Sequence, residues 1–553
     1  MKTRPPDRVQ PYRRPRIAAA QPAALTLGGG RKGWMEMLKT AAFAGVSWLA
    51  FMGAASAQEA IQTQHPAAPA DPRDVRIHEL EQRLEEIEAQ IEDLKASSAA
   101  DVQNVRDTAA AQPTISVANG RPTIASADGN FRFSVRGLAQ FDLAHYDQDS
   151  AATPDNRRGD TTNASDLNSG GNFRRARIGV EGTAFRDWNY ALTYEMGGTG
   201  SESPALNQAY VEYTGWKLFN NTVPLRFRIG AWATPTGLED ATSNTESLFL
   251  ERAAPAELVR GLAGGDGRSS IAVFANGERW YGSAALTGGI VGNSGEYDEQ
   301  TGYLLRAAFL PLKGQDYGLH VGANVSGIIE PADTDPSALT QERVRLRERP
   351  ELRNDTTRFV DTGNINAGGL TAYGVELGGY WRNFYAAGEA FQIDVDRSGA
   401  GADPNFSGWY VQAAWTLTGE SHKWSAANGG FQGIRPATAF DPRSGHWGAW
   451  EIAARYSDLN LNYHEGALNT AALANNTVRG GEQTITTIGL NWYPNSVVRF
   501  LLDYQWVSID RLDPENGVIA GTTIFGGAPS VLGDGAQIGQ DYQVVSLRSQ
   551  FAF

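Results

Sequence analysis

The chain has 553 residues, no cysteine, a net charge of −14 and a mean hydropathy of −0.37. Without cysteine it has no disulfide, thiolate metal site or cysteine nucleophile. Its acidity argues against nucleic-acid binding, which needs a basic surface. Outside the N-terminal region no run of about 20 apolar residues occurs, which excludes a helical membrane protein but not a transmembrane β-barrel, because a barrel's membrane signal is alternation.

The N-terminal segment, residues 1–57, is predicted to be an extension plus a secretory signal peptide. It is basic, and an apolar stretch at 41–55 is followed by Ala55-Ser56-Ala57. A charged region, an apolar stretch too short to span a bilayer and an A-x-A site are typical of a cleaved signal. We expect cleavage after Ala57; a membrane anchor is the alternative, and the short apolar stretch disfavours it.

Residues 76–96 are predicted to form a short coiled coil. Apolar residues recur there in steps of three and four: Ile77, Leu80, Leu84, Ile87, Ile91 and Leu94. The seam is shorter than three heptads, so the coil needs an oligomer formed elsewhere, and its isoleucines permit a trimer. A single amphipathic helix is the alternative. The flanking segments 58–75 and 97–129 are predicted linkers.

From residue 130 to residue 553 the apolar period is two, which predicts β-strands throughout. Tight turns alternate with long loops, the pattern of bacterial outer-membrane barrels. One connection, 419–446, is long although it belongs to the side of the short turns. The sixteen predicted strands are 131–145, 173–185, 188–197, 206–215, 224–233, 268–276, 279–291, 301–310, 317–328, 370–381, 384–396, 406–418, 447–458, 482–493, 496–509 and 540–553.

The last strand shows the two faces clearly. Val545, Leu547 and Phe551 alternate with Ser546 and Arg548. A charge on the lipid face would cost about 2–4 kcal/mol at mid-membrane, so the charged face is expected to line a lumen. The predicted fold class is all-β: a 16-stranded antiparallel transmembrane β-barrel with an N-terminal periplasmic coiled-coil helix, located in the bacterial outer membrane.

A barrel of this size has an interior too wide for side chains to fill, so we expect a water-filled channel. Arginine suits an anion path because it stays charged and binds oxyanions through a planar fork. Alternatively, the arginines pair with lumen acids such as Glu181, Glu212, Glu451 and Asp503, which would leave a nonselective pore. The arginines predicted to face inward on strands are Arg174, Arg175, Arg177, Arg226, Arg228, Arg306, Arg455, Arg499 and Arg548.

Two long loops carry further candidates. The loop 234–267 is long enough to fold inward and narrow the lumen, and the loop 329–369 is rich in arginine. The second loop is an anion funnel, a contact for lipopolysaccharide phosphates, or a solvated, self-paired segment. The candidate residues of the two loops are Glu239, Asp240, Thr245, Glu251, Arg252, Arg347, Arg349 and Arg353.

Several segments carry a family resemblance: FRRARIGVEG at 173–182, AYVEY at 209–213, GAWEIAARYS at 448–457 and GLNWY at 489–493. Together they resemble the phosphate-selective porin O and P family. The resemblance implies a trimeric sixteen-stranded channel with an arginine-lined path and inward-folded third and fifth loops.

The family's Arg-Arg pair matches Arg174 and Arg175, its third-loop Glu-Arg matches Glu251 and Arg252, and its arginine-rich fifth loop matches 345–353. Thr245 and Asn189 stand where phosphate-specific members have lysine, and Arg177 where they have tyrosine. These departures favour a broader anion or small-solute porin.

The function predicted from the sequence is therefore passive diffusion of small solutes through a homotrimeric outer-membrane porin that prefers anions such as phosphate. The expected partners are copies of the chain itself, outer-membrane lipid or lipopolysaccharide, and these anions. A nonselective porin and an envelope-tethering barrel are the alternatives. A barrel hydrolase is more remote, because only His320 of the seven histidines lies well inside a strand and no G-x-S-x-G motif accompanies it. No enzyme activity, cofactor or metal is expected.

Overall fold

The computed structural model describes residues 71–148, 166–198, 205–219, 222–292, 297–333, 342–399, 401–465, 476–512, 518–523, 529–531 and 539–553. The predicted signal peptide and most of the predicted linker 58–75 lie outside these residues. The chain divides into two units, Met1–Glu92 and Asp93–Phe553.

Helix α1 spans Pro72–Ala111 and is longer than the predicted 76–96. Its apolar seam is exposed along its length, for example Leu84 at 59% and Leu94 at 67%. The predicted linker 97–129 is wrong in its first part, because its alanine-rich residues favour helix until Pro113 stops it. No helix in the described part of the chain is long and apolar enough to cross a membrane.

The second part of the predicted linker is a β-hairpin, β1 (Thr114–Ala118) and β2 (Arg121–Ala125). The two strands are joined by Asn119 and Gly120, whose φ angles are +52° and +76°. Asn-Gly with both φ positive is the tight turn that best fits the twist of a two-stranded hairpin. Strand β2 also pairs with the start of β3, Thr123 lying opposite Ser134, so the hairpin extends the barrel sheet.

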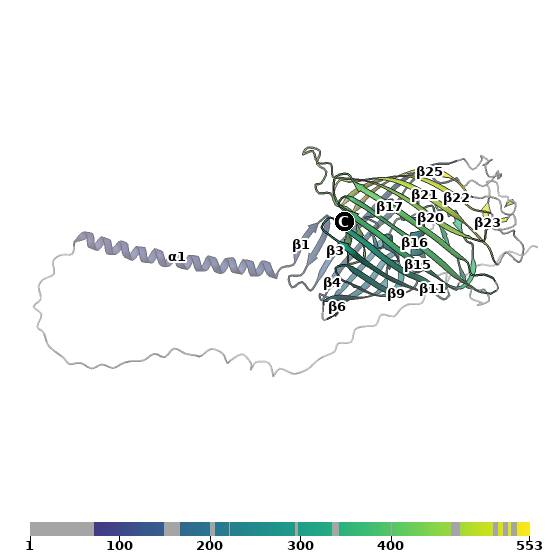
Figure 1. Ribbon diagram of the computed structural model, residues 1–553. Coiled ribbons are helices and arrows are strands. Elements are labelled where there is room, and N and C mark those ends of the chain that lie inside the picture. The colour runs from purple at the N-terminus through teal and green to yellow at the C-terminus, as the bar shows by residue number, and fades with distance from the viewer. Residues whose placement is uncertain are drawn as a thin grey trace, which may run out of the picture. The chain divides into compact units, whose positions relative to one another are not determined.

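Sixteen antiparallel strands close into a barrel (Figure 1), as the alternation predicts. Each strand pairs with the next, and β25 pairs with β3 from Gln543 opposite Asp147 to Ala552 opposite Leu138, which closes the ring. The strands are β3 (Arg132–Asp147), β4 (Gly170–Ala184), β5 (Trp188–Glu195), β6 (Ala205–Leu218), β7 (Val223–Ala231), β8 (Arg268–Asn276), β9 (Trp280–Ile290), β10 (Thr301–Lys313), β11 (Tyr317–Glu330), β15 (Ile365–Trp381), β16 (Phe384–Arg397), β17 (Asn405–Thr416), β20 (Ala449–Tyr463), β21 (Val478–Tyr493), β22 (Val498–Asp510) and β25 (Tyr542–Ala552).

The two faces of the strands lie as predicted. On β25, Leu547 and Phe551 are 40% and 48% exposed on the outer wall, whereas Arg548 and Ser546 are buried inside. Along β17 exposed and buried residues alternate without exception. The outer wall is therefore apolar, and polar side chains line the interior.

Short connections gather at one end of the barrel, which we call the turn end, and long ones at the other, the loop end. The long connection 417–448 at the turn end is the exception that the sequence also showed. It carries a small hairpin, β18 (Lys423–Ser425) and β19 (Gly430–Gln432). This hairpin lies inside the barrel, because the inward Arg306 donates to the carbonyl oxygens of Asn428 at 2.8 Å and Gly429 at 2.7 Å. We call residues 421–434 the lumen hairpin.

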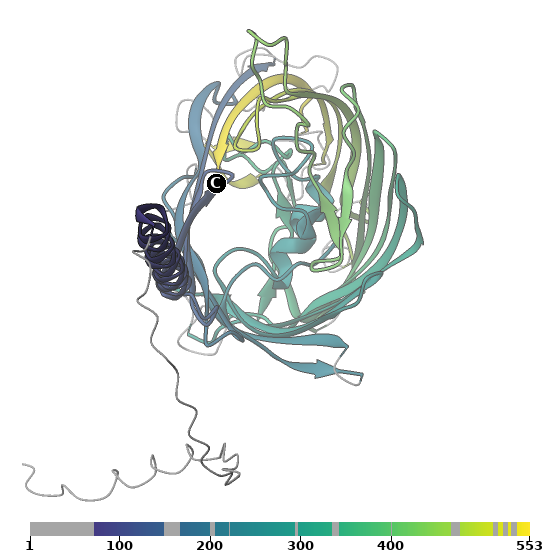
Figure 2. The same cartoon turned by 90° about the vertical axis from the view of Figure 1, so that its left-hand side faces the viewer.

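Two long connections from the loop end also occupy the interior. The first, 232–267, carries α2 (Leu238–Ala241) and α3 (Ala254–Ala263), and Figure 2 shows α3 inside the ring of strands. We call 232–267 the third loop.

The fifth loop, 331–364, carries three short strands and packs its Leu346 and Val360 with Val259 of α3 in a buried apolar cluster. This core fills the interior near β16, β20 and β22. The short strands are β12 (Arg343–Val344), β13 (Arg347–Glu348) and β14 (Val360–Asp361), and the connection between β22 and β25 carries β23 (Val518–Thr523) and β24 (Pro529–Val531).

Candidate functional site

A polar cavity of about 660 Å³ lies near the turn end of the barrel. It is bordered by the hairpin β1–β2, the inner faces of β3 and β22, the tip of the third loop at 243–246, and residues 433–435. Six arginines and one glutamate line it: Arg121, Arg132, Arg136, Arg177, Arg435, Arg499 and Glu246. This cavity, in which arginines outnumber acidic residues, is the candidate functional site.

Several of these arginines have carboxylate partners. Arg121 and Arg136 share Glu181, at nitrogen–oxygen distances of 2.5 and 2.9 Å. Arg435 lies 3.3 Å from Glu246, but its side chain is 61% exposed. Since exposed pairs stabilise little, the Arg435 guanidinium remains available to a solute in the cavity.

Arg177 has two partners. Its Nε lies 2.5 Å from Glu195 and its Nη2 lies 2.9 Å from Asp266 of the third loop. Burial alone would raise the pKa of Asp266, but Arg260 and Arg177 hold that pKa well below its usual range. Asp266 therefore stays ionised and neutralises part of the charge of Arg177.

Arg132 and Arg499 differ from the other four, because no carboxylate oxygen of the described residues lies within 4 Å of their guanidinium nitrogens. Arg499 is 3% exposed and lies 4.7 Å from the ring centroid of Tyr493. The paired carboxylates are Glu181, Glu195, Glu246 and Asp266. Counting side chains, six arginines against four carboxylates leave an excess of two positive charges.

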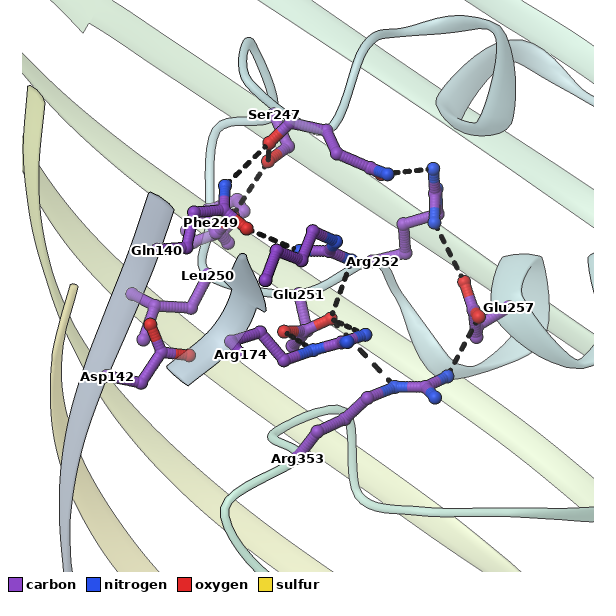
Figure 3. A network of polar contacts seen from close by, with 12 residues as sticks. Gln140, Asp142, Arg174, Ser247, Phe249, Leu250, Glu251, Arg252, Glu257 and Arg353 are labelled. Atoms are coloured by element: carbon purple, nitrogen blue, oxygen red, sulfur yellow. Dashed lines mark hydrogen bonds and ion pairs between the residues drawn. The ribbon is translucent and has the colours of Figure 1, made fainter. Parts of the chain in front are cut away.

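Further into the barrel, four arginines surround one carboxylate of the third loop, Glu251; Figure 3 shows it with two of them, Arg174 and Arg353. Glu251 accepts from Arg174 Nε at 2.7 Å and Nη2 at 3.3 Å, and from Arg548 Nη2 at 2.8 Å. Arg175 lies 3.6 Å away and Arg353 of the fifth loop 3.9 Å away. We call these four arginines the Glu251 cage. Burial opposes ionisation of Glu251, but the arginines of the cage hold its pKa well below the usual range.

Behind the cage, Arg548 is also bound by Asp142 of β3. Both nitrogen–oxygen distances are 2.6 Å, and both side chains are 1% exposed. Arg548 also donates to the carbonyl oxygen of Leu250. A fully buried, two-bond pair of this kind fixes the arginine, so the cage is rigid on this side.

On its other side the third loop continues as a row of alternating charges. Arg252 lies 3.0 Å from Glu257 and 3.4 Å from Asp240, and Arg260 lies 2.7 Å from Asp240. Arg353 reaches Glu257 at 2.8 Å. Burial alone would raise the pKa of Glu257, but Arg260, Arg353 and Arg252 lower it to about 2. The row joins the third loop to the fifth.

Wall residues anchor the third loop through its backbone. Glu389 of β16 accepts from the backbone nitrogens of Leu238 at 2.7 Å and Glu239 at 2.9 Å, and so binds the N-terminus of α2. Arg455 of β20 donates to the Glu251 carbonyl at 3.0 Å and lies 3.2 Å from the Glu239 carboxylate. Burial outweighs Arg455 and raises the pKa of Glu239 to about 7.

Two histidines hold the lumen hairpin. His422 Nδ1 faces the Gln432 carbonyl at 2.9 Å and its Nε2 faces Glu451 at 2.7 Å. Both ring nitrogens of His422 therefore lie within hydrogen-bond distance of an oxygen atom. His320 instead accepts from Trp424 Nε1 at 3.0 Å, so its Nδ1 carries no proton. Each histidine ties the hairpin to the barrel wall.

The structure brings most of the candidate residues together at the third loop and disperses the rest. The group that meets there is Arg174, Arg175, Arg252, Arg353, Arg548, Glu239, Asp240 and Glu251. Thr245 lines the cavity with Arg177, and its carbonyl accepts from Gln550 at 3.0 Å.

The candidates on β7, and Arg347 and Arg349 of the fifth loop, lie apart from the cage. Arg228 pairs with Glu212 at 2.7 Å, and Arg226 donates to the Ala427 carbonyl at 2.7 Å. Arg347 is exposed and Arg349 is buried. The predicted pairing of lumen arginines with acids is thus present in part. The acid that contacts the largest number of arginines is Glu251, which belongs to the third loop.

Sequence reasoning missed several residues of this site. Asp142 had a signal, because it occupies an inward position on β3 two residues from Gln140. Arg132 was missed although it lies within the predicted strand 131–145. Asp266 and Arg260 lie in the loop, where alternation says nothing about direction. Among the described residues no group of three His, Asp or Glu side chains is placed to hold a metal ion.

Comparison with known proteins finds a matching family model and a similar curated protein. The family model for phosphate-selective porin O and P matches residues 145–528. Porin O of Pseudomonas aeruginosa is 27% identical over 420 residues, covering 71% of this chain and 87% of that protein.

Two solved structures are among the similar ones. A loop-deletion mutant of the Vibrio cholerae outer-membrane protein OmpT has a TM-score of 0.42 at 11% identity, covering 77% of this chain and 100% of that one. An anion-selective porin from Comamonas acidovorans has a TM-score of 0.40 at 10% identity, covering 76% and 100%.

Proposed function

Since the chain belongs to the phosphate-selective porin O and P family and is therefore a porin of the bacterial outer membrane, we propose that it carries small anions by passive diffusion. The turn end then faces the periplasm and the loop end the exterior, as in other bacterial barrels. The observation that carries the anion preference is the cavity with two arginines in excess of its paired carboxylates.

Fixed charges in a narrow passage select ions by sign. Arg132 and Arg499 have no carboxylate within 4 Å among the described residues, so their charge acts on a solute in the cavity. Arginine also binds oxyanions through its planar fork and stays protonated at every physiological pH. Phosphate and small carboxylates are therefore the solutes that the cavity suits best.

A broad anion channel is favoured over a phosphate-specific one. The positions at which phosphate-specific members of the family carry lysine hold Thr245 and Asn189. Asn189 donates to Glu212 at 3.1 Å, so it adds no charge to the passage. Transport needs no chemical step, and no enzyme activity, cofactor or metal is part of the proposal.

Planar-bilayer recording of the purified porin tests this function. In a tenfold gradient of KCl the reversal potential should have the sign of a chloride-preferring pore, and phosphate added to the chloride solution should lower the chloride current. Cation preference, with no effect of phosphate, would refute the anion preference and leave a porin of another selectivity.

We also propose that three copies of the chain assemble and that their α1 helices form a coiled coil. The support is the exposed apolar seam of α1, which a single helix leaves in water. Cross-linking of the detergent-solubilised protein should give a trimer, and deletion of 72–111 should weaken it. A monomer in both forms would contradict the assembly.

A further inference from the structure

The Glu251 cage is built like an anion-binding site, but its occupant belongs to the chain. Arginines from β4, β25 and the fifth loop converge on one carboxylate of the third loop. Arg174 binds it with two hydrogen bonds, the geometry by which arginine recognises free carboxylates. A site that binds the carboxylate of a side chain in this way also suits a small free carboxylate.

The arginines of the cage differ in how far the neutralisation of their charge depends on Glu251. Arg548 has Asp142 as a second carboxylate partner and Arg353 has Glu257. Arg175 has no carboxylate other than Glu251 within 4 Å in the described part of the chain, and its buried Nε has no hydrogen-bond partner there. Without Glu251 the cage would therefore hold a buried, uncompensated arginine, which strongly favours the entry of another anion.

The cage is one layer of side chains away from the arginine-lined cavity. Arg175 donates to Gln140 at 2.8 Å, and Gln140 donates in turn to Gln550 at 2.7 Å and to the Asn244 carbonyl at 3.3 Å. Both Gln550 and Asn244 line the cavity. The lining of the cavity at Gln550 and Asn244 is thus joined to the cage through the amide of Gln140.

We propose that Glu251 is the tethered occupant of a carboxylate-binding site and that its presence keeps permeating anions from binding tightly. A tethered group competes at an effective concentration far above that of a dilute solute, so free anions do not displace it. Passing anions then meet only the arginines of the cavity, and flux does not saturate at low concentration. This inference rests on the proposed anion channel and names carboxylates as the ligand class of the cage.

Glu251→Ala tests the proposal, because it removes the carboxylate and leaves room for a small one. With acetate as the probe, chloride current through this variant should fall by half at roughly millimolar acetate, the range of a weak ion-binding site. Under the same conditions the wild-type chloride current should stay proportional to the chloride concentration. Acetate should also raise the thermal transition of Glu251→Ala more than an equal concentration of chloride does.

Glu257→Ala is the matched control, since it removes a buried carboxylate of the same loop that also contacts Arg353 but does not lie in the cage. Acetate should neither block this variant nor stabilise it. Equal effects of acetate on both variants, or none on Glu251→Ala, would overturn the proposal. If Glu251→Ala does not fold in buffer, its refolding yield with formate replaces the thermal test: a recovery that chloride does not give supports the proposal, and no recovery overturns it.

The selectivity of the wild-type channel is measured separately. If acetate occupies the cage of Glu251→Ala while the wild-type channel prefers cations, the cage assignment stands and the anion preference fails.

Discussion

Reversing the charge of Arg132 should change the ion selectivity of the channel more than any substitution at the paired arginines. Arg132 lines the cavity, and none of the described carboxylates lies within 4 Å of it. In Arg132→Glu the excess of two positive charges becomes zero. No ion pair is broken and no buried charge is created, so the barrel should fold as before.

The size of the effect follows from Coulomb's law. A unit charge about 7 Å from an ion in water contributes about 0.6 kcal/mol, and a reversal changes this by about 1.2 kcal/mol. Salt at 0.1 M, with a Debye length of about 10 Å, reduces the change to about 0.6 kcal/mol for each ion. Anions lose and cations gain this amount, so the permeability ratio of chloride to potassium should fall roughly eightfold.

Reversal potentials in a KCl gradient measure this ratio directly. Arg382→Glu is the matched control, because Arg382 is an exposed arginine at the same end of the barrel that does not line the cavity. Its guanidinium lies 5.3 Å from the ring centroid of Trp381 on the outer wall. An unchanged ratio in Arg132→Glu, or an equal change in both variants, would refute the assignment of the cavity as the selective part of the passage.

Three further predictions concern the buried polar groups. The pKa of Glu257 is lowered to about 2 from 4.5, so its ionised form stabilises the fold by about 3 kcal/mol above pH 4.5, and this contribution is lost as pH falls toward 2. The thermal transition temperature of Glu257→Gln should therefore depend less on pH between pH 5 and 2 than that of the wild type. An equal pH dependence in both proteins would contradict the pairing. His422→Phe removes the ring nitrogens that contact Glu451 and the Gln432 carbonyl, so the lumen hairpin should loosen and single-channel conductance should rise. A conductance equal to that of the wild type would show that the hairpin does not depend on His422. Asp142→Asn leaves Arg548 buried with a weakened partner and should lower the free energy of unfolding by about 3–5 kcal/mol. On heating in detergent, the folded band should then disappear at a lower temperature than in the wild type. A decrease in stability below about 1 kcal/mol would show that the pair is not needed for the fold.

The sequence predicted the barrel well because each strand has two different surroundings. On β25 the outward residues must be apolar and the inward ones polar, so period two is visible without any knowledge of the fold. The hairpin β1–β2 was missed although Asn119-Gly120 is a strong turn signal, since the segment lies in a stretch whose composition resembles a linker. The predicted helix 76–96 lies within helix α1, which begins four residues earlier and ends fifteen residues later.

The interior was harder to predict for a physical reason. Alternation gives the direction of a strand residue but not the partner that it meets, because that partner comes from a loop. Arg226 meets the carbonyl oxygen of Ala427 in the lumen hairpin, which belongs to the long connection at the turn end, and the sequence did not indicate that this connection folds inward. Likewise Arg174 and Arg175 were expected to line the path, yet a loop carboxylate covers them.

The division of the arginines into two groups explains how one interior both holds its loops and passes anions. Buried arginines such as Arg174 and Arg548 pair with acids at 2.6–2.8 Å, and their charge is used to fix the third loop. Less constrained arginines such as Arg132 and Arg435 face the cavity, where water and solutes reach them. A strand arginine that a loop carboxylate reaches therefore contributes less charge to the ion path, as Arg177 does beside Asp266. The number of arginines in the wall overstates the positive charge that a permeating anion meets, and the carboxylates of the third loop determine how much of that charge remains.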